Sequence, residues 1–323
     1  MWTNTAAVLD CTQDQFFDVV HAALRGCCNF IQKVCRSKLE KVRMAMTART
    51  CSLPVRMVSN EALLLMAPVF LILLGAAAVV IPLVVVLFVM YHKLSLGTSL
   101  LREQITRETT NVASNVFAQL EALLYLQQEL KLSHALPPTR GWAASPDFLR
   151  NVCSHTLAQR PASVVECSSG ISTLVLARCM QLNGQGHVHS LEHDPEFAEK
   201  TRQLLRLHGL ESWATVCDAP LKPLVLPSWT GQWYSYEVLP AKLAIELMVI
   251  DGPPWFVAEL ARYPAIPALY ERMQANSAVF LDDADRPGEK ELVRRWEAEF
   301  PALQKMLVPI CEKGCVALKK TGS

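Results

Sequence analysis

Residues 161–173 and 187–197 constrain the fold more than any other part of the chain. The first segment reads PASVVECSSGIST, an apolar run that ends in an acid and leads through small residues into a helical pattern. The second, HVHSLEHDPEF, ends another apolar run at Glu192, about twenty residues beyond the small-residue loop. An acid at this spacing can accept hydrogen bonds from a ribose. The two segments therefore predict a βαβ unit that binds a nucleoside.

From Ser145 onward, apolar runs of strand length alternate with helical patterns. We expect strands at 163–167, 187–191, 214–217, 247–250 and 278–281, and helices near 174–182, 195–208, 254–274 and 288–300. The final stretch, MLVPICEKGCVALKK, indicates a strand, a turn at 312–314 and a second strand. Together these predict a doubly wound, Rossmann-like α/β fold whose seven-stranded sheet is mainly parallel. The terminal hairpin, with its antiparallel strand, separates this fold from that of NAD dehydrogenases.

Residues 62–91 carry no charged side chain. A helix of this length would run about 45 Å, whereas the hydrocarbon core of a bilayer is about 30 Å thick. We expect one transmembrane helix, tilted or kinked at Pro82, with the lipid bilayer as a partner. A re-entrant hairpin and a buried helix of a soluble core are the alternatives. A cleavable signal peptide is not expected, because the run is too long and starts too far from the N-terminus.

The rest of the chain divides around this run. Residues 1–60 form a basic extension, in which 16–46 either make a cationic amphipathic helix on anionic lipid or stay solvated or disordered. After the transmembrane segment at 61–92, residues 93–136 are helical in pattern. Their apolar side chains suit a coiled-coil stalk that could form a homo-oligomer, or a helix packed on the next domain. Those apolar residues are Val116, Leu120, Leu123 and Leu130. Residues 137–323 form the α/β domain.

The charges around the apolar run conflict with the expected location of the α/β domain. Basic residues before the run outnumber those after it: Lys41, Arg43, Arg49 and Arg56 against Lys93, Arg102 and Arg107. The positive-inside tendency would then leave the α/β domain outside the cell. A domain that uses a cytosolic nucleotide-like cofactor belongs in the cytoplasm. The conflict disappears if Met57 is the natural start and residues 1–56 are an upstream extension of the reading frame.

Composition and missing motifs exclude several functions. The net charge of +1 provides no basic field for nucleic acid, so no such partner is expected. The eleven cysteines show no zinc-ligand spacing, and the eight histidines form no triad. Neither G-x-S-x-G nor a P-loop occurs, which leaves hydrolases and kinases without support. The lack of G-x-G-x-x-G disfavours an NAD-dependent oxidoreductase.

Over about residues 132–320, the chain resembles class I S-adenosylmethionine-dependent methyltransferases. It looks closest to a bacterial group with the motifs E-C-G-S-G-x-S-T, D-G-P-P and L-D-D-A-x-R. Here they read ECSSGIST at 166–173, DGPP at 251–254 and LDDADR at 281–286, each at the end of an expected strand. The resemblance implies methyl transfer from S-adenosylmethionine. An oxygen of a small-molecule or glycan acceptor near the membrane would receive the methyl group.

The resemblance assigns cofactor contacts to the first strand and its loop. Glu166 would hold the methionine amino group. Ser168 and Gly170 would approach the cofactor through their backbone, and Ser172 could cap the following helix. Ser168 stands where the group usually has glycine, and if φ is positive there, serine costs about 1 kcal/mol. The alternative function is therefore a non-catalytic, membrane-tethered scaffold with a degenerate domain.

The next two strands would hold the nucleoside. Glu192 would accept hydrogen bonds from both ribose hydroxyls, as one carboxylate can. His193 would border the adenine, or lie in a solvated loop. Asp218 could accept from the adenine amino group, or be a turn residue, and Ala219 would line the adenine pocket.

Three acids end the strands that follow. Asp251 would contact the cofactor and act as the catalytic residue that orients or deprotonates the acceptor. Asp251, Asp282 and Asp283 would repel one another without a compensating cation. Catechol-type O-methyltransferases place a divalent metal here, which suits Mg²⁺, but they carry a lysine shortly after the first aspartate where this chain has Pro-Pro-Trp. Neutralisation by Arg286 and Lys290 is the alternative.

Substrate contacts are expected from residues that flank these motifs. Arg286 could clamp an anionic acceptor. Aromatic side chains could cover a sugar or an aromatic acceptor, although core packing is their more usual role. These are Trp142, Trp233, Tyr234 and Tyr236.

Overall fold

The computed structural model describes residues 58–139 and 141–322, with five single residues before them: Arg25, Lys33, Arg36, Glu40 and Arg43. The chain forms two compact units, Met1–Thr98 and Ser99–Ser323. The expected amphipathic helix at 16–46 lies outside the described residues except at those five positions. The suggested start at Met57 lies outside them as well.

From Val58 onward, the described residues of the first unit belong to helix α2 (Val58–Leu130), which contains Pro68 and Pro82. This confirms that the apolar run is helical. Within the described part of the chain, α2 is the one helix whose length and composition would allow it to cross a bilayer. Its apolar side chains from Met66 to Met90 are largely exposed, which suits an apolar environment. Its placement in a membrane remains a prediction.

The second unit contains a seven-stranded sheet in the order β3-β2-β1-β6-β7-β9-β8. Its strands are β1 (Ser163–Cys167), β2 (His187–Glu192), β3 (Ala214–Asp218), β6 (Ile245–Ile250), β7 (Met273–Asp282), β8 (Leu303–Met306) and β9 (Cys315–Lys320). The first five are parallel, and β9 runs antiparallel between β7 and β8. The predicted seven-stranded α/β sheet with a C-terminal antiparallel hairpin is confirmed.

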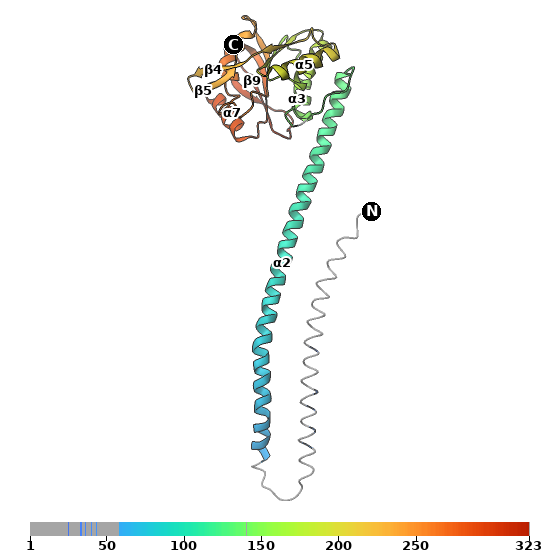
Figure 1. Ribbon diagram of the computed structural model, residues 1–323, viewed down its shortest axis with the longest axis vertical. Helices are drawn as coiled ribbons and strands as arrows, with labels where there is room; N and C mark the ends of the chain where they lie inside the picture. The colour runs from blue at the N-terminus through green and yellow to red at the C-terminus, as the bar shows by residue number, and fades with distance from the viewer. Residues whose placement is uncertain are drawn as a thin grey trace. The chain divides into compact units, whose positions relative to one another are not determined.

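Apolar side chains cover both faces of the sheet, since successive strand residues point in opposite directions. Val164 belongs to the core on one face and Val165 to the core on the other. Three helices cover the first face: α3 (Pro146–Gln159), α4 (Ile171–Asn183) and α5 (Pro195–His208). The second face carries α6 (Ala265–Leu269), α7 (Pro287–Glu299) and the two-stranded sheet of β4 (Leu221–Leu226) and β5 (Trp229–Tyr234). Figure 1 shows α3 and α5 on one side of the domain and α7 with β4 and β5 on the other.

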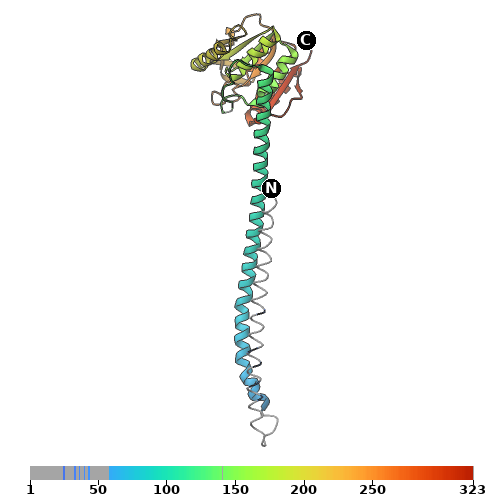
Figure 2. The same cartoon turned by 90° about the vertical axis from the view of Figure 1, so that its right-hand side faces the viewer.

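The last turns of α2 belong to this domain. Leu126 and Leu130 are fully buried in the core of the first face, and Figure 2 shows the green end of α2 against the domain. Gln119 donates to the carboxylate of Asp147 at 2.7 Å, which ties α2 to the start of α3. Of the four residues in the predicted stalk pattern, Leu130 therefore packs on the domain, while Val116 and Leu120 are exposed.

The bounds of α5 follow directly from local sequence. The Asp194 side chain accepts hydrogen bonds from the backbone of Glu196 and Phe197 at 2.8 and 3.2 Å, and Pro195 occupies the first turn. Gly209 ends the helix with φ +64°, a left-handed conformation that glycine adopts without strain. These end signals explain why the helix predicted at 195–208 is confirmed to the residue.

Two expectations about the second half of the domain are wrong, and one hairpin in it was not predicted. The helix expected at 254–274 is mostly turns, with α6 and a short 3-10 helix (Tyr270–Arg272) before β7 starts at Met273. Pro264 lacks the N–H that a continuous helix would need. The β4–β5 hairpin was not expected, because its connection, Pro227-Ser228, lacks the usual Asn-Gly or Asp-Gly signal. The first strand of the terminal hairpin ends at Met306, earlier than predicted.

Candidate functional site

The strand order reverses at β1, which defines the place where ligands bind in open α/β sheets. The chain runs from β1 to β2 and β3 on one side and later returns to β6 and β7 on the other. The backbone N–H of Asp251, just after β6, donates to the carbonyl of Cys167 at the end of β1 at 3.1 Å. The loops that follow β1, β2, β6 and β7 carry most of the predicted site residues.

The loop after β1 has the strained backbone that its serine suggested. Ser168 has φ +97°, and because this φ is positive, serine carries the expected cost of about 1 kcal/mol at this position. Two hydrogen bonds hold this residue: its N–H donates to Leu191 O at 2.9 Å, and Ser190 Oγ donates to its carbonyl at 2.7 Å. At Gly170, a Cβ would meet no atom within 4 Å, so the backbone here borders open space.

Glu166 lies at the end of β1 and is fully buried. Thr173 Oγ1 donates to its Oε2 at 2.5 Å and accepts from the Gly170 N–H at 2.9 Å, whereas Ser172 lies buried in the first turn of α4. Oε1 has no hydrogen-bond partner among the described residues. Burial raises the pKa of Glu166 to about 7, against the opposing effect of nearby hydroxyl groups. The site thus contains a buried acceptor that a cationic donor would satisfy.

Glu192, at the end of β2, accepts four hydrogen bonds from its own chain. Ser169 donates to Oε2 through its N–H at 2.9 Å and its hydroxyl at 3.0 Å. The N–H groups of His193 and Asp194 donate to Oε1 at 2.8 and 3.0 Å. Burial alone would raise the pKa of Glu192, but the His193 side chain, whose Nδ1 lies 3.1 Å from Oε1, and the hydrogen bonds from Asp194 and Ser169 outweigh burial and lower the pKa. Because a carboxylate offers about four acceptor positions, a ribose hydroxyl would have to replace one of these donors.

The other predicted nucleoside contacts lie around Glu192, with Asp218 beside it in the register of β2 and β3. The backbone N–H of Ala219 donates to Glu192 O at 2.7 Å, and the Ala219 side chain is buried. His193 follows Glu192 directly. The Asp218 side chain is 68% exposed and pairs with Arg202 at 2.6 Å. Arg202 therefore competes with adenine for Asp218, and the adenine contact remains a prediction.

Tyr234, at the end of β5, lies between the ends of β1 and β6. Its ring contacts the His193 ring edge-on, with centroids 5.9 Å apart, and it is 2% exposed. A Cβ on Gly252 would lie 2.5 Å from Tyr234 Oη and 2.8 Å from Ser168 Cβ. The hydroxyl has no hydrogen-bond partner in the described part of the chain, and burial raises its pKa. This side chain occupies space next to the loops where the strand order reverses.

The three acids after β6 and β7 converge as expected. Asp251, Asp282 and Asp283 each place a carboxylate oxygen within 4.8 Å of the others. The cation among them is Arg262, a buried residue that sequence reasoning missed because it lies in the segment expected to be helical. Its Nη2 lies 3.1 Å from Asp251 Oδ1 and 2.9 Å from Asp283 Oδ2.

The two cations expected to neutralise these acids divide between different partners. Arg286 contacts Asp283 at 3.0 Å, as predicted. Lys290 pairs instead with Asp285 at 3.0 Å, so this part of the expectation is wrong. One turn of α7 separates the two side chains, and Lys290 faces the exposed acid.

Burial raises the pKa of two of the acids, and the pKa of Asp282 is raised more than that of Asp251. It raises the pKa of Asp251 to about 6, against the lowering effect of Arg262. Burial, together with the charges of Asp251 and Asp283, raises the pKa of Asp282 to about 8. Asp282 therefore holds its proton more tightly than Asp251 does. With 16% of its side chain exposed, Asp251 can meet a ligand as a base.

Exposed aromatic rings lie beside the loop that carries Asp251. Trp142 is 78% exposed, and its ring contacts that of Phe256 with centroids 6.3 Å apart. Trp255, also exposed, contacts Phe256 at 5.9 Å. Trp142 is thus available to a ligand, and its contact with substrate remains a prediction.

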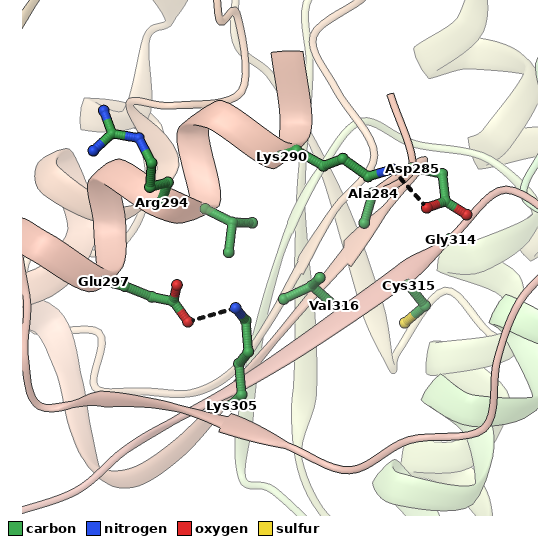
Figure 3. Close-up of a pocket in the computed structure, with 10 residues that line it drawn as sticks. Ala284, Asp285, Lys290, Arg294, Glu297, Lys305, Gly314, Cys315 and Val316 are labelled. Carbon is green, nitrogen blue, oxygen red and sulfur yellow. Dashed lines mark ion pairs between the residues drawn. The ribbon is translucent and has the colours of Figure 1, made fainter. Parts of the chain in front are cut away.

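A hollow of about 420 Å³ lies between α7 and the β8–β9 hairpin, and Figure 3 shows the residues that line it. Its charged side chains pair with one another or with a neighbour on α7: Lys290 with Asp285, Lys305 with Glu297, and Arg294 with Glu291. It is lined by the α7 side of the hairpin and not by the ends of β1 and β2. None of the predicted cofactor residues lines it.

The fold and site define an α/β domain whose predicted ligand residues lie where the strand order reverses. Residues 165–284 match the family model described as a methyltransferase domain. This match spans β1 to the loop after β7 and supports the methyltransferase resemblance. A comparison of the sequence with curated proteins gave no match.

Solved structures similar to this chain include three methyltransferases. One is the O-methyltransferase TomG of Streptomyces achromogenes in complex with SAM, with 14% identity, a TM-score of 0.44 and coverage of 65% of this chain and 96% of that chain. SAH-bound PaMTH1 of Podospora anserina has 14% identity, a TM-score of 0.46 and coverage of 66% and 96%. The O-methyltransferase of Bacillus cereus in complex with SAH has 18% identity, a TM-score of 0.39 and coverage of 63% and 91%.

Proposed function

We propose that the C-terminal domain transfers a methyl group from S-adenosylmethionine to an oxygen of a small-molecule or glycan acceptor. The observation that carries this proposal is Glu166 Oε1, a fully buried carboxylate oxygen that lacks a partner among the described residues. It lies beside the Ser168–Gly170 backbone, within the segment that matches the methyltransferase family. The amino group of the cofactor is a cationic donor of the kind that this oxygen lacks.

The residues fit such a cofactor at its methionine end. Glu166 would accept from the ammonium group, and the open space at Gly170 allows close approach to the backbone. At the sugar end, Glu192 would bind a ribose hydroxyl only after giving up one donor, and the Ser169 hydroxyl is the one that a small side-chain rotation can release. S-adenosylmethionine supplies an electrophilic methyl group when it is bound.

Asp251 is the residue proposed to act on the acceptor. It is partly exposed and lies at the carboxyl edge of the sheet, and Arg262 beside it opposes the rise in its pKa that burial causes. Its carboxylate can orient an acceptor hydroxyl and take its proton, a contribution of typically 10²–10⁴-fold for general base catalysis. Trp142 and Arg286 would contact the acceptor.

Calorimetry with S-adenosylhomocysteine tests the cofactor half of this proposal on the full chain in detergent. We expect binding to the wild type and an affinity about 10- to 100-fold weaker for Glu166→Gln, as loss of a charge-assisted hydrogen bond predicts. Glu196→Gln is the matched control, because Glu196 is exposed on α5 and pairs only with Lys200 among the described residues. Equal affinities for wild type and Glu166→Gln would contradict the proposed contact.

A second candidate, a membrane-tethered scaffold with a degenerate domain, is favoured by two observations. Donors from the same chain occupy the acceptor positions of the Glu192 carboxylate, and Tyr234 occupies space next to the loops where the strand order reverses. A scaffold would show no heat with S-adenosylhomocysteine. Transfer of labelled methyl groups into the lipid or glycan fraction of a membrane extract would exclude it.

We also propose that the apolar part of α2 anchors the protein in a membrane with the α/β domain in the cytoplasm. The length and composition of the helix support this, as does the cytosolic origin of the proposed cofactor. The exposed apolar residues Val112, Val116 and Leu120 are compatible with a homo-oligomer through the stalk. Protease protection in sealed membrane vesicles tests the topology.

A further inference from the structure

Arg262 lies at the centre of the acid cluster and contacts several of its oxygens. Its Nη2 donates to three oxygens: Asp251 O at 2.9 Å, Asp251 Oδ1 at 3.1 Å and Asp283 Oδ2 at 2.9 Å. Its Nη1 donates to Asp282 O at 2.9 Å, and its Nε lies 3.9 Å from Glu289 Oε1. One guanidinium group therefore joins the ends of β6 and β7 to the start of α7.

The environment keeps this cation charged and in place. Arg262 is 4% exposed, and Asp283 and Glu289 are buried beside it. Burial by itself would lower the pKa of Arg262, but the surrounding carboxylates outweigh burial and raise it. Among these acids, Asp283 has a second cationic contact in Arg286, which is more exposed. The guanidinium thus compensates the acids from inside the cluster.

A divalent metal and Arg262 would require the same oxygens. Mg²⁺ needs near-octahedral oxygen ligands at about 2.0–2.1 Å and draws on carboxylates of the kind gathered here. Arg262 Nη2 already lies between Asp251 Oδ1 and Asp283 Oδ2, the oxygens that face one another across the cluster. Two cations in one buried space also repel each other. The residues present therefore do not fit a metal at this position.

We propose that Arg262 is the built-in cation of this site, so that it takes the position of a divalent metal and holds Asp251 in place for the acceptor. Arg262 is a positioning residue, since it acts through Asp251. It binds both the backbone carbonyl and Oδ1 of that residue, and Oδ2 makes none of these contacts. The contacts between Arg262 and the acids do not depend on the proposed function. The effect of Arg262 on catalysis rests on that function.

Electron paramagnetic resonance with Mn²⁺ tests the proposal on the full chain without any assay of activity. We expect no specific Mn²⁺ site in the wild type. In Arg262→Met, removal of the guanidinium should raise Mn²⁺ affinity at least about tenfold, and Asp283→Asn in the same background should remove the gain. Arg286→Met is the matched control, because it deletes a cation at Asp283 but leaves Arg262, and it should gain no site.

Two results would overturn the proposal. One is a Mn²⁺ site in the wild type that Asp251→Asn or Asp283→Asn abolishes. The other is a folded Arg262→Met variant with no gain in Mn²⁺ affinity. If that variant does not fold, Arg262→Lys replaces it, because it keeps a charge and should exclude Mn²⁺ as the wild type does. A Mn²⁺ site in Arg262→Lys would contradict the proposal, since the retained charge should keep the metal out.

Methyl transfer provides a separate readout. If the domain transfers methyl groups, EDTA should leave the rate of the wild type unchanged, and a rate that EDTA abolishes and Mg²⁺ restores would overturn the proposal. Arg262→Lys should lower kcat more than it changes KM for the cofactor, since it disturbs Asp251 and leaves Glu166 untouched. If no methyl transfer is found, the proposed function fails and the Mn²⁺ experiment still decides the role of Arg262.

Discussion

Ser169 and Glu192 connect the loop after β1 to the end of β2 by two hydrogen bonds, one from the Ser169 N–H at 2.9 Å and one from its hydroxyl at 3.0 Å. Both reach Oε2, while Oε1 accepts from the two residues that follow Glu192. The carboxylate therefore organises two loops of the candidate site in addition to any contact with a nucleoside. Its substitution should affect folding as well as binding.

Replacement of Glu192 by glutamine should lower the free energy of unfolding by about 1–3 kcal/mol. The amide nitrogen of glutamine is a donor and would face at least one of the N–H groups that the carboxylate now accepts. Urea unfolding of the full chain in detergent measures the change. Glu196→Gln, an exposed control on α5, should stay within about 0.5 kcal/mol of wild type. A stable Glu192→Gln variant would mean that these loops do not depend on the carboxylate.

Glu166 should make stability depend on pH. Its pKa is raised from 4.5 to about 7 by burial. The folded state therefore binds this proton more tightly than the unfolded state. The stabilisation is present in full below pH 4.5 and is lost as pH rises through about 7, with a total of about 3 kcal/mol.

Glu166→Gln should remove this loss, because glutamine is neutral throughout. The difference in unfolding free energy between wild type and variant, measured from pH 4.5 to 8, isolates the contribution of this group. A difference that does not change with pH would contradict the raised pKa. For the wild type, we also expect affinity for S-adenosylhomocysteine to rise through pH 7, since the ammonium group requires the charged carboxylate.

Ser168→Gly should stabilise the protein by up to about 1 kcal/mol. Ser168 has φ +97°, a conformation that glycine adopts with less strain. Ser169→Gly is the matched control one residue away, and it should destabilise because the hydroxyl bond to Glu192 is lost. Thermal unfolding monitored by circular dichroism compares the two. A less stable Ser168→Gly variant would indicate that the serine side chain makes a compensating contribution.

Tyr234→Phe should leave stability unchanged or raise it by about 1 kcal/mol. The buried hydroxyl of Tyr234 has no partner within the described residues, and such a group carries a desolvation cost of about 1–3 kcal/mol. Urea unfolding tests this. A loss of stability would reveal a hydrogen bond to the hydroxyl, and a separate loss of affinity for S-adenosylhomocysteine would show that the ligand uses it.

Most of the fold was predictable because its signals are local. The strand at 163–167 and the helix at 195–208 are confirmed to the residue, since each is bounded by its own turn or capping residues. Continuous apolar runs make the central strands recognisable, because both faces of the sheet are covered, and their alternation with helices fixes a parallel sheet. The helix predicted at 254–274 was wrong, because prolines interrupt a segment whose composition otherwise favours a helix. The β4–β5 hairpin was not predicted, because Pro-Ser is a weak turn signal.

The sequence by itself determined which acids end the strands, because the carboxyl ends of parallel strands share one edge of the sheet. Only the tertiary structure decided what surrounds those acids. Arg262, Ser169 and Tyr234 reach Asp251, Glu192 and Gly252 from other segments, through long-range contacts that no local pattern encodes. The charge of each acid and the hydrogen bonds that it can still accept depend on these distant partners. The chemistry that each acid can perform therefore depends on them as well.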